Sequence, residues 1–398
     1  MTQAFVGIRI LDFTQVLAGP FGVMQLALLG AEVIKIEQPV TGDQTRGLMN
    51  DGEPGMSPSF MTCNVNKKSM TLNLKAPEAA EIIQRLVAGA DVLVENFKAG
   101  TMERLGFGYD ELKKIRPDLV YCSLTGYGQN GPRAGDAAYD GAIQAASGMM
   151  SQTGHPSTGP TRTGYMPVDM ATALNAAFSI SAALYRRLAT GEGQRIDLAM
   201  LDTAIVAQAA QYSNYLNAGT LVGLGGNASP TRQPAGDVFE TRDGYIQVTA
   251  LRDNQVAGLL KAIGAADRLD DPRFATADGR LENPELVKTV VREGLITKPT
   301  AWWMQHLAAA GVPVAEVRTL PEVMEDPQLA YRGVFETLPS PLDPSRPVHV
   351  VKAGFITDRD GPRIRSGPPV LGAQTTEILR DAGYSSKDIE SFREKGVI

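Results

Sequence analysis

The chain has few of the residues that most often build metal centres and nucleophile–histidine pairs. Its 398 residues include two cysteines and three histidines. The cysteines, Cys63 and Cys122, form no CxxC motif, which argues against a zinc site and a disulfide scaffold and suits a reducing cytosol. We therefore expect no metal and a cytoplasmic location. Acid–base or nucleophilic work is then left to carboxylates, tyrosine, lysine or backbone groups.

Long runs of a single charge and long apolar runs are also missing. The net charge of −6 is spread along the chain, so we expect no nucleic-acid partner. The longest uncharged stretch after Asp169 ends at Tyr185 and is about one helical turn short of a membrane span. We read it as a buried helix and expect no membrane contact. The first residues show no charged leader before an apolar stretch, so no signal peptide is expected.

Several nucleotide and hydrolase motifs are absent. Without GxxxxGK followed by Ser or Thr, ATP-driven ligation lacks its usual phosphate cradle. No GxGxxG follows the first expected strand, which disfavours a nicotinamide-dependent oxidoreductase. GxSxG and HExxH are missing too, and His155 lies in a loop, where a histidine is more often inert than catalytic.

The first half of the chain alternates between strand and helix patterns. Strands are expected at 8–13, 32–37, 91–97 and 117–128, with helices at 20–30 and 76–90. Such rounds with short connections predict an α/β fold with a parallel, doubly wound sheet whose ligands bind at its carboxyl edge.

The second half changes character. Residues 223–237 have the Gly- and Pro-rich composition of a linker, within which the glycines at 223–226 could instead form an active-site lid. Strands are expected at 243–251 and 348–357, and helices over much of 253–311 and 371–398. We predict a large domain over 1–200, a linker helix over 201–224, a small domain over 225–325 and a return to the large domain over 326–398.

One carboxylate has an unusual setting. Asp169 lies in GYMPVDMATALNAAF (164–178), between a proline and a run of small uncharged residues. Judged on this segment alone, it is more often a helix cap than a nucleophile. At a helix N-terminus it would meet backbone N–H groups, which favour the ionised form and could stabilise an oxyanion.

Several stretches in fixed order resemble the class III (CaiB/BaiF-type) CoA-transferase family, which includes formyl-CoA and carnitine-type CoA transferases. They are RILDFTQVLAGPFGVMQLALLGAEVIKIEQP (9–39), NVNKKSMTLNLKAPE (64–78), DVLVENFKAGTMERLGFGYDEL (91–112), SLTGYGQNGP (123–132), YDGAIQAASG (139–148), the Asp169 segment, GEGQRIDLAMLD (191–202) and PPVLGAQTTEIL (368–379). The resemblance thus covers nearly the whole chain.

This resemblance implies an interlocked, ring-shaped homodimer with a Rossmann-like large domain and a smaller α+β domain. It implies an enzyme that moves CoA from an acyl-CoA donor to a small carboxylic acid acceptor, with CoA as substrate and no permanently bound cofactor. Asp169 matches the family's nucleophile, which forms anhydride and aspartyl-CoA thioester intermediates.

The same resemblance assigns further site residues. Tyr139 and Asp140 match an active-site tyrosine and an acidic residue that orients active-site groups. CoA contacts are implied for eight positions, namely Gln15, Val16, Ala18, Leu72, Lys75, Asn96, Phe97 and Arg104. Individually, Lys75 and Arg104 are more often solvated charges, and Phe97 and Tyr139 more often packing residues.

The sequence also departs from the formyl-CoA transferases. Gln15 stands for His, Leu17 for Gln, Gln38 for Arg and Ala137 for Lys, so formate–oxalate exchange is not expected, and a different acid such as succinate or a branched or unsaturated acid is. One rival is a 2-methylacyl-CoA racemase. Its catalytic histidine position is occupied here by Tyr139, so the two-base mechanism of a racemase would lack one of its bases. Another is a non-catalytic acyl-CoA-binding protein, which could dispense with Asp169.

Overall fold

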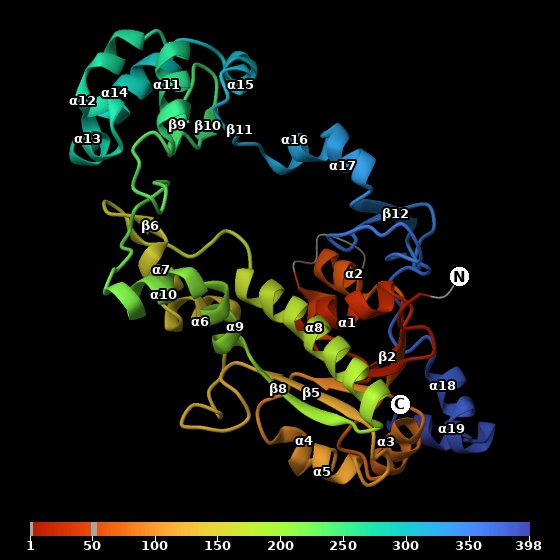
Figure 1. Ribbon diagram of the computed structural model, residues 1–398. Coiled ribbons are helices and arrows are strands. Elements are labelled where there is room, and N and C mark those ends of the chain that lie inside the picture. The colour runs from red at the N-terminus through yellow and green to blue at the C-terminus, as the bar shows by residue number, and fades with distance from the viewer. Residues whose placement is uncertain (1–2, 49–53) are drawn as a thin grey trace. The chain divides into compact units, whose positions relative to one another are not determined.

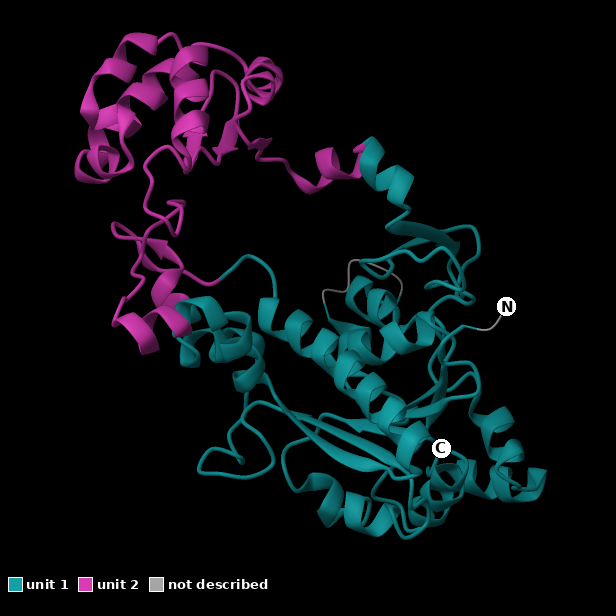
Figure 2. Ribbon diagram, in the orientation of Figure 1, with its two compact units in different colours: residues 1–149, 163–212, 327–398 teal, residues 150–162, 213–326 magenta. Residues whose placement is uncertain are grey.

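The computed structural model describes residues 3–48 and 54–398. The chain packs into two compact units (Figure 2). The first unit consists of residues 1–149, 163–212 and 327–398, and the second of residues 150–162 and 213–326. The domains predicted from the sequence have boundaries at residues 200, 224 and 325, which differ from the limits of these two units. That division into domains stays a prediction.

The first unit is built on a sheet of six strands, all of them parallel (Figure 1). The strands are β1 (Arg9–Asp12), β2 (Glu32–Glu37), β3 (Lys67–Thr71), β4 (Val92–Glu95), β5 (Val120–Thr125) and β8 (Gln194–Ala199). Their order is β3-β2-β1-β4-β5-β8, so the chain changes direction across the sheet between β1 and β4. Doubly wound sheets bind ligands at the carboxyl ends of the strands around that point. The predicted α/β class with a parallel sheet is confirmed.

Each face of the sheet carries its own hydrophobic core, because successive residues of a strand point to opposite faces. On one face Ile10 shares a core with Val23 of α1 (Ala18–Leu28) and Ile180 of α8 (Pro167–Thr190). On the other face Leu11 shares a core with Ile83 of α3 (Ala79–Ala88) and with residues of α18 (Thr375–Asp381) and α19 (Ser386–Glu394). The C-terminal segment therefore completes the large unit.

Helices α1 and α8 approach closely on the first face. Gly22 of α1 makes this possible, since a Cβ at that position would lie 2.6 Å from the carbonyl oxygen of Ala173 on α8. Asp169 lies one helical turn before Ala173, so this contact fixes the first turns of α8 against α1.

The first unit contains further short elements. They are η1 (Gln44–Gly47), α2 (Pro58–Asn64), α4 (Thr101–Arg104), α5 (Tyr109–Leu112), α6 (Asp140–Ala146), α9 (Met200–Ala207), α17 (Pro327–Arg332) and the hairpin of β12 (Phe335–Pro339) and β13 (Pro347–Val351). Two helices, α7 (Met149–Gln152) and α10 (Ala209–Ala218), continue from this unit into the second.

The second unit has its own antiparallel sheet and core. Its sheet joins β9 (Val238–Glu240), β10 (Tyr245–Val248) and β11 (Val314–Glu316), and β6 (Gly154–His155) pairs with β7 (Gly159–Pro160). Its helices are α11 (Asp253–Ala262), η2 (Ala266–Asp270), α12 (Pro272–Ala275), α13 (Ala277–Glu282), α14 (Pro284–Leu295), α15 (Thr300–Ala309) and α16 (Leu320–Met324). Buried Trp303 donates its ring N–H to the carbonyl oxygen of Leu295 at 2.6 Å, which satisfies the one polar group of this core side chain.

Two features of the first unit differ from the sequence expectations. Strand β3 was missed, because its sequence KKSMT has no apolar run. The expectation of a buried helix over α8 is wrong for one of its faces, since Phe178 is 73% exposed and Leu188 is 84% exposed. No helix in the described part of the chain is both long and apolar enough to cross a membrane.

Candidate active site

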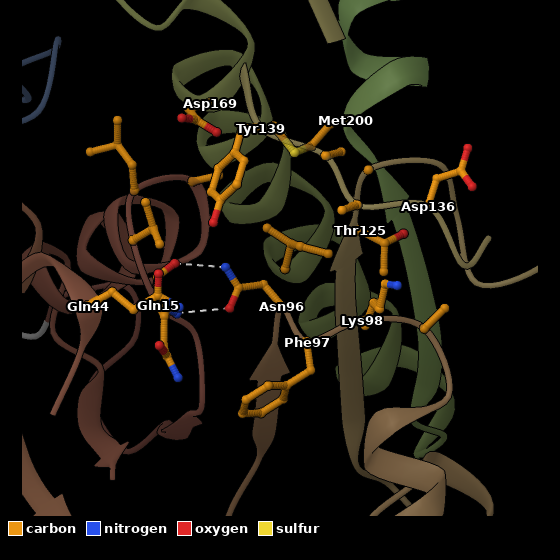
Figure 3. A pocket seen from close by; sticks show the side chains of 18 of the residues that line it. Gln15, Gln44, Asn96, Phe97, Lys98, Thr125, Asp136, Tyr139, Asp169 and Met200 are labelled. Carbon is orange, nitrogen blue, oxygen red and sulfur yellow. Dashed lines mark hydrogen bonds between the residues drawn. The ribbon is translucent and has the colours of Figure 1, made fainter. Parts of the chain in front are cut away.

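A cavity of about 420 Å³ opens at the carboxyl ends of β1, β4 and β5, entirely within the first unit (Figure 3). Its walls come from the turn after β1, the loop after β4, the segment before α6 and the first turn of α8. The residues that line it include Gln15, Val16, Leu17, Ala18, Gln44, Asn96, Phe97, Lys98, Thr125, Asp136, Ala137, Tyr139, Asp169 and Met200. The volume is in the range of small-molecule sites.

The turn after β1 is clamped to the loop after β4. The backbone N–H of Gln15 donates to Oδ1 of Asn96 at 2.8 Å, and Nδ2 of Asn96 donates back to the carbonyl oxygen of Gln15 at 2.8 Å (Figure 3). The next residue, Val16, has φ +71°, which is rare for a β-branched residue. Such strain persists only where surrounding contacts fix it, and it commonly marks a functional site.

Those contacts come from a set of buried ion pairs beneath the turn, which we call the charge cluster: Asp12–Lys67, Lys35–Asp43 and Glu37–Arg46. Their N···O distances are 2.8, 2.8 and 2.7 Å, and none of the six side chains is more than 4% exposed. Every carboxylate in the cluster thus has a cation at contact distance.

The charge cluster is bonded directly to the turn. Nζ of Lys35 donates to the carbonyl oxygen of Thr14 at 2.6 Å, and the N–H of Val16 donates to Oδ1 of Asp43 at 3.2 Å. Burial by itself would raise the pKa of Asp12, but Lys67 and Lys35 outweigh it and hold that pKa below its usual value. The cluster is therefore a charged scaffold that fixes the cavity wall.

The loop after β4 contains a different kind of buried carboxylate. Oε2 of Glu95 accepts the N–H of Phe97 at 2.8 Å, and burial raises the pKa of Glu95 to about 7. The sequence analysis missed Glu95, although a lone acid at the end of the apolar run VLVE signals a buried charge.

The first N–H groups of α8 are capped by Asp140 and not by Asp169. No side chain of the N-cap residue, Met166, bonds the start of α8. Instead, Oδ2 of Asp140 accepts the N–H groups of Val168 at 2.9 Å and Asp169 at 3.1 Å. The N–H of Met170 is bonded to the carbonyl oxygen of Met166. The expectation that these N–H groups serve Asp169 or an oxyanion is wrong, because they are already occupied.

The carboxyl group of Asp169 is left facing the cavity. Burial, and then the neighbouring Asp140 carboxylate, raise its pKa to about 6. The predicted preference for the ionised form is therefore wrong as well, since desolvation and like charge outweigh the helix N-terminus. At neutral pH the group is still largely ionised, and a more basic carboxylate is a stronger nucleophile.

Tyr139 stands beside Asp169 at the cavity. It is the N-cap residue of α6, and its side chain is 68% exposed in the single chain. Figure 3 shows its ring directed from the Asp169 side towards the Gln15–Asn96 pair. Its exposure excludes a simple packing role within this chain.

The structure brings together most of the predicted site residues, but four lie outside the cavity lining. One is Asp140, which is buried and caps α8. Leu72 is 1% exposed within the core beneath α3. Lys75 is exposed, and so is Arg104, whose guanidinium donates to Oγ1 of Thr101 at 2.9 Å. Their predicted nucleotide contacts stay predictions. Among residues 3–48 and 54–398 no group of His, Cys, Asp and Glu side chains is arranged to hold a metal ion.

Comparison with known proteins identifies the class. CoA-transferase family III matches residues 5–375, and the chain belongs to this family. It is 34% identical to a succinyl-CoA:glutarate CoA-transferase of Mus musculus, over 98% of this chain and 89% of that protein. It is 36% identical to an acetyl-CoA:oxalate CoA-transferase of Acetobacter aceti, over 95% of each.

A solved structure agrees with these relatives. A CaiB/BaiF family protein from Brucella suis superposes with a TM-score of 0.87 and 32% identity, covering 96% of this chain and all of that one. The chain is therefore an enzyme, a family III CoA-transferase that uses acyl-CoA substrates.

Proposed function

We propose that this enzyme moves CoA from an acyl-CoA thioester to a free carboxylic acid through covalent intermediates on Asp169. One observation carries the proposal. Asp169 lines the cavity, its pKa is raised to about 6, and within residues 3–48 and 54–398 no cation or hydrogen-bond donor is bonded to its carboxyl oxygens. A structural aspartate would be expected to bond a donor or a cation.

The reaction begins when a carboxylate oxygen of Asp169 attacks the thioester carbonyl carbon. The C–S bond breaks, CoA leaves as thiolate, and an anhydride joins Asp169 to the donor acyl group. The thiolate then attacks the Asp169 carbonyl carbon and expels the donor carboxylate, which leaves an aspartyl-CoA thioester.

The second half repeats these steps with the acceptor. Its carboxylate attacks the aspartyl-CoA thioester and releases the thiolate, forming a new anhydride. The thiolate attacks the acceptor-derived carbonyl carbon, which yields the new acyl-CoA and restores the Asp169 carboxylate. One thioester replaces another, so the exchange needs neither ATP nor a permanently bound cofactor.

Oxyanion stabilisation falls to the other wall of the cavity, because the first N–H groups of α8 are occupied. Helix α1 has no side-chain cap, and its first residue, Ala18, lines the cavity with Leu17. The N–H groups at this helix start have no hydrogen-bond partner in the described part of the chain, so they suit the oxygen of a tetrahedral intermediate. The clamp on Gln15 and the charge cluster hold these donors in place.

For the acids we propose dicarboxylates, with succinyl-CoA as the first donor to test. The mammalian relative is named for succinate and glutarate, and the bacterial one for oxalate. Among the described residues that line the cavity, Lys98 is the only lysine or arginine. A cation there suits an anionic group of the substrate, either the distal carboxylate or the CoA diphosphate.

We further propose that the active form is the interlocked homodimer of the family, with a smaller α+β domain, working in the cytoplasm. The uncovered face of α8 supports a dimer, since Leu174, Phe178, Tyr185 and Leu188 are 56–84% exposed at helical spacing. Contiguous apolar surface of this kind marks an interface. Sedimentation at twice the chain mass of 42.5 kDa is expected, and a monomer at assay concentration would contradict it.

The covalent step can be tested by peptide mass spectrometry after incubation with succinyl-CoA and no acceptor. We expect a CoA-sized or acyl adduct, trapped with hydroxylamine, on the Asp169 peptide. Asp169→Asn is the control and should carry none. No adduct with a panel of donors, together with α-proton exchange in deuterated water, would replace the transferase mechanism by a racemase.

A further inference from the structure

A buried glutamine lies behind the nucleophile. Gln144 is on α6, one turn after Asp140, and is fully buried. Its Nε2 donates to Oδ1 of Asp140. Its Oε1 accepts the N–H of Thr163 at 3.1 Å and lies 3.2 Å from the Oγ1 of Thr163. Both ends of the amide are therefore used.

These partners demand an amide and fix its orientation. A carboxylate accepts hydrogen bonds, so the NH₂ group must face Asp140, and a backbone N–H donates, so the carbonyl oxygen must face Thr163. Glutamate would place like charge against Asp140 once ionised. Methionine would leave Oδ1 of Asp140 and the N–H of Thr163 without this partner. No other side chain of this length supplies a donor and an acceptor without net charge.

The partners of Asp140 are all neutral. Its two oxygens accept from the Gln144 amide and from the N–H groups of Val168 and Asp169. Neutral donors solvate a carboxylate without cancelling its charge, so its field still reaches Asp169. A lysine in place of Gln144 would cancel that field.

Gln144 also connects two segments of the site. Thr163 is three residues before the N-cap of α8, and its Oγ1 lies 2.9 Å from the carbonyl oxygen of Tyr165, which is an alternative acceptor for the hydroxyl. By bonding Thr163, Gln144 ties the segment that leads into α8 to helix α6. Gln144 therefore does two things: it donates a hydrogen bond to Asp140, and it anchors the backbone segment that leads to Asp169.

We propose that Gln144 is a positioning residue for the nucleophile, which holds the Asp140 carboxylate beside Asp169 without a cation and fixes the start of α8. This role rests on the proposed transferase function and deepens it. The consequence is a more basic Asp169, and therefore a faster first step, than burial in the cavity alone would give.

The other charged or titratable groups around α8 do not replace Asp140. On the elements packed against α8, α1 has no titratable residue, α6 has only Asp140, and α9 has only the exposed Asp202; β5 carries Tyr121 and Cys122, and β8 carries Arg195 and Asp197. The Cys63 thiol on α2 also interacts with Asp169, but burial raises the pKa of Cys63 to about 12, so it stays neutral.

The test compares Gln144→Met with a matched control, Gln208→Met. Gln208 is also buried, but its amide donates to the carbonyl oxygens of Ser147 and Ala204. For Gln144→Met with succinyl-CoA we expect a KM within about twofold of wild type and a kcat lower by on the order of a hundredfold. The acid limb of kcat should move below the wild-type midpoint of about 6, because the Asp140 carboxylate is no longer held in place beside Asp169. Gln208→Met should leave the limb in place.

Gln144→Glu gives a second test in case Gln144→Met fails to fold. The introduced carboxyl group could still donate to Asp140 while protonated, whereas its ionised form would repel Asp140, so activity should fall on the alkaline side where wild type is flat. A folded Gln144→Met with an unmoved limb, or a Gln144→Glu without the alkaline fall, would overturn the role. If wild type itself forms no adduct on Asp169, the proposed function fails instead.

Discussion

Two groups of carboxylates in the first unit are withdrawn from water to different degrees and differ in their partners. Asp12, Glu37 and Asp43 in the charge cluster each contact a lysine or arginine, and their pKa values lie below the usual ones despite burial. Glu95 and Asp169 contact no cation among the described residues, and burial raises their pKa values to about 7 and about 6.

This difference in partners suggests different roles for the two groups: the paired carboxylates support the structure, and an unpaired one is suited to act as a nucleophile. A carboxylate matched by a cation and donors is stabilised in its charged form and has little tendency to attack a carbonyl carbon. A carboxylate that is desolvated without a cation costs folding free energy but is more basic. The paired acids thus shape the wall, and this contrast is why we propose Asp169 as the group that reacts.

The largest effect on stability is expected from Asp12→Asn. The substitution leaves the buried Lys67 ammonium without its carboxylate, which should lower the free energy of unfolding by about 3–5 kcal/mol. Because the native pKa of Asp12 is lowered from 3.8, the deficit should be full above about pH 4 and should shrink as pH falls below it. Urea unfolding at pH 7 and pH 3 measures both. Equal stability of variant and wild type at pH 7 would contradict the claim that the Asp12–Lys67 pair supports the structure.

The same acid-to-amide change at Asp169 should have the opposite sign. Asp169→Asn removes a desolvated charge beside Asp140 and should raise the free energy of unfolding at neutral pH by about 3 kcal/mol. Since the pKa is raised from 3.8 to about 6, wild type loses this stability as pH rises through that window. The gain should therefore vanish near pH 3.5 and be complete above pH 6. A destabilised Asp169→Asn protein would contradict the account.

A smaller gain is expected from Glu95→Gln. The amide oxygen can still accept the N–H of Phe97, and the buried charge is removed. Burial of the new NH₂ group at this enclosed position offsets much of that gain, so we expect about 1 kcal/mol of added stability. The pKa of Glu95 is raised from 4.5 to about 7, which places the gain above pH 7 and its disappearance near pH 4.5. Thermal unfolding across pH 4.5–8 checks this, and a gain that persists unchanged at pH 4.5 would rule out titration of Glu95 as its cause.

The sequence predicted the parts of this structure that are local. The apolar runs of β1, β2, β4 and β5 and the spacing of α1 and α3 indicate the parallel sheet directly, and the ordered family motifs point to Asp169. Strand β3 was missed because Lys67 is buried only through its pairing with Asp12, 55 residues earlier in the chain. Such a contact leaves no periodic signal.

The electrostatics of the site could not be predicted for the same reason. The cap on α8 comes from Asp140, 28 residues before Val168, and the amide that solvates Asp140 is recognisable only once both are placed. A local reading assigned the N–H groups of α8 to Asp169, whereas tertiary contacts give them to its neighbour. The outward apolar face of α8 was likewise indistinguishable from a buried one in the sequence.

The most direct test is the pH dependence of single-turnover adduct formation on Asp169 with succinyl-CoA and no acceptor, followed by rapid quench and peptide mass spectrometry. The rate should rise with the ionisation of Asp169, with a midpoint of about pH 6, and should then be level through neutral pH. A midpoint near pH 4, the range of an ordinary aspartate, or an adduct on any other residue, would contradict the claim that an unpaired carboxylate beside Asp140 is the nucleophile.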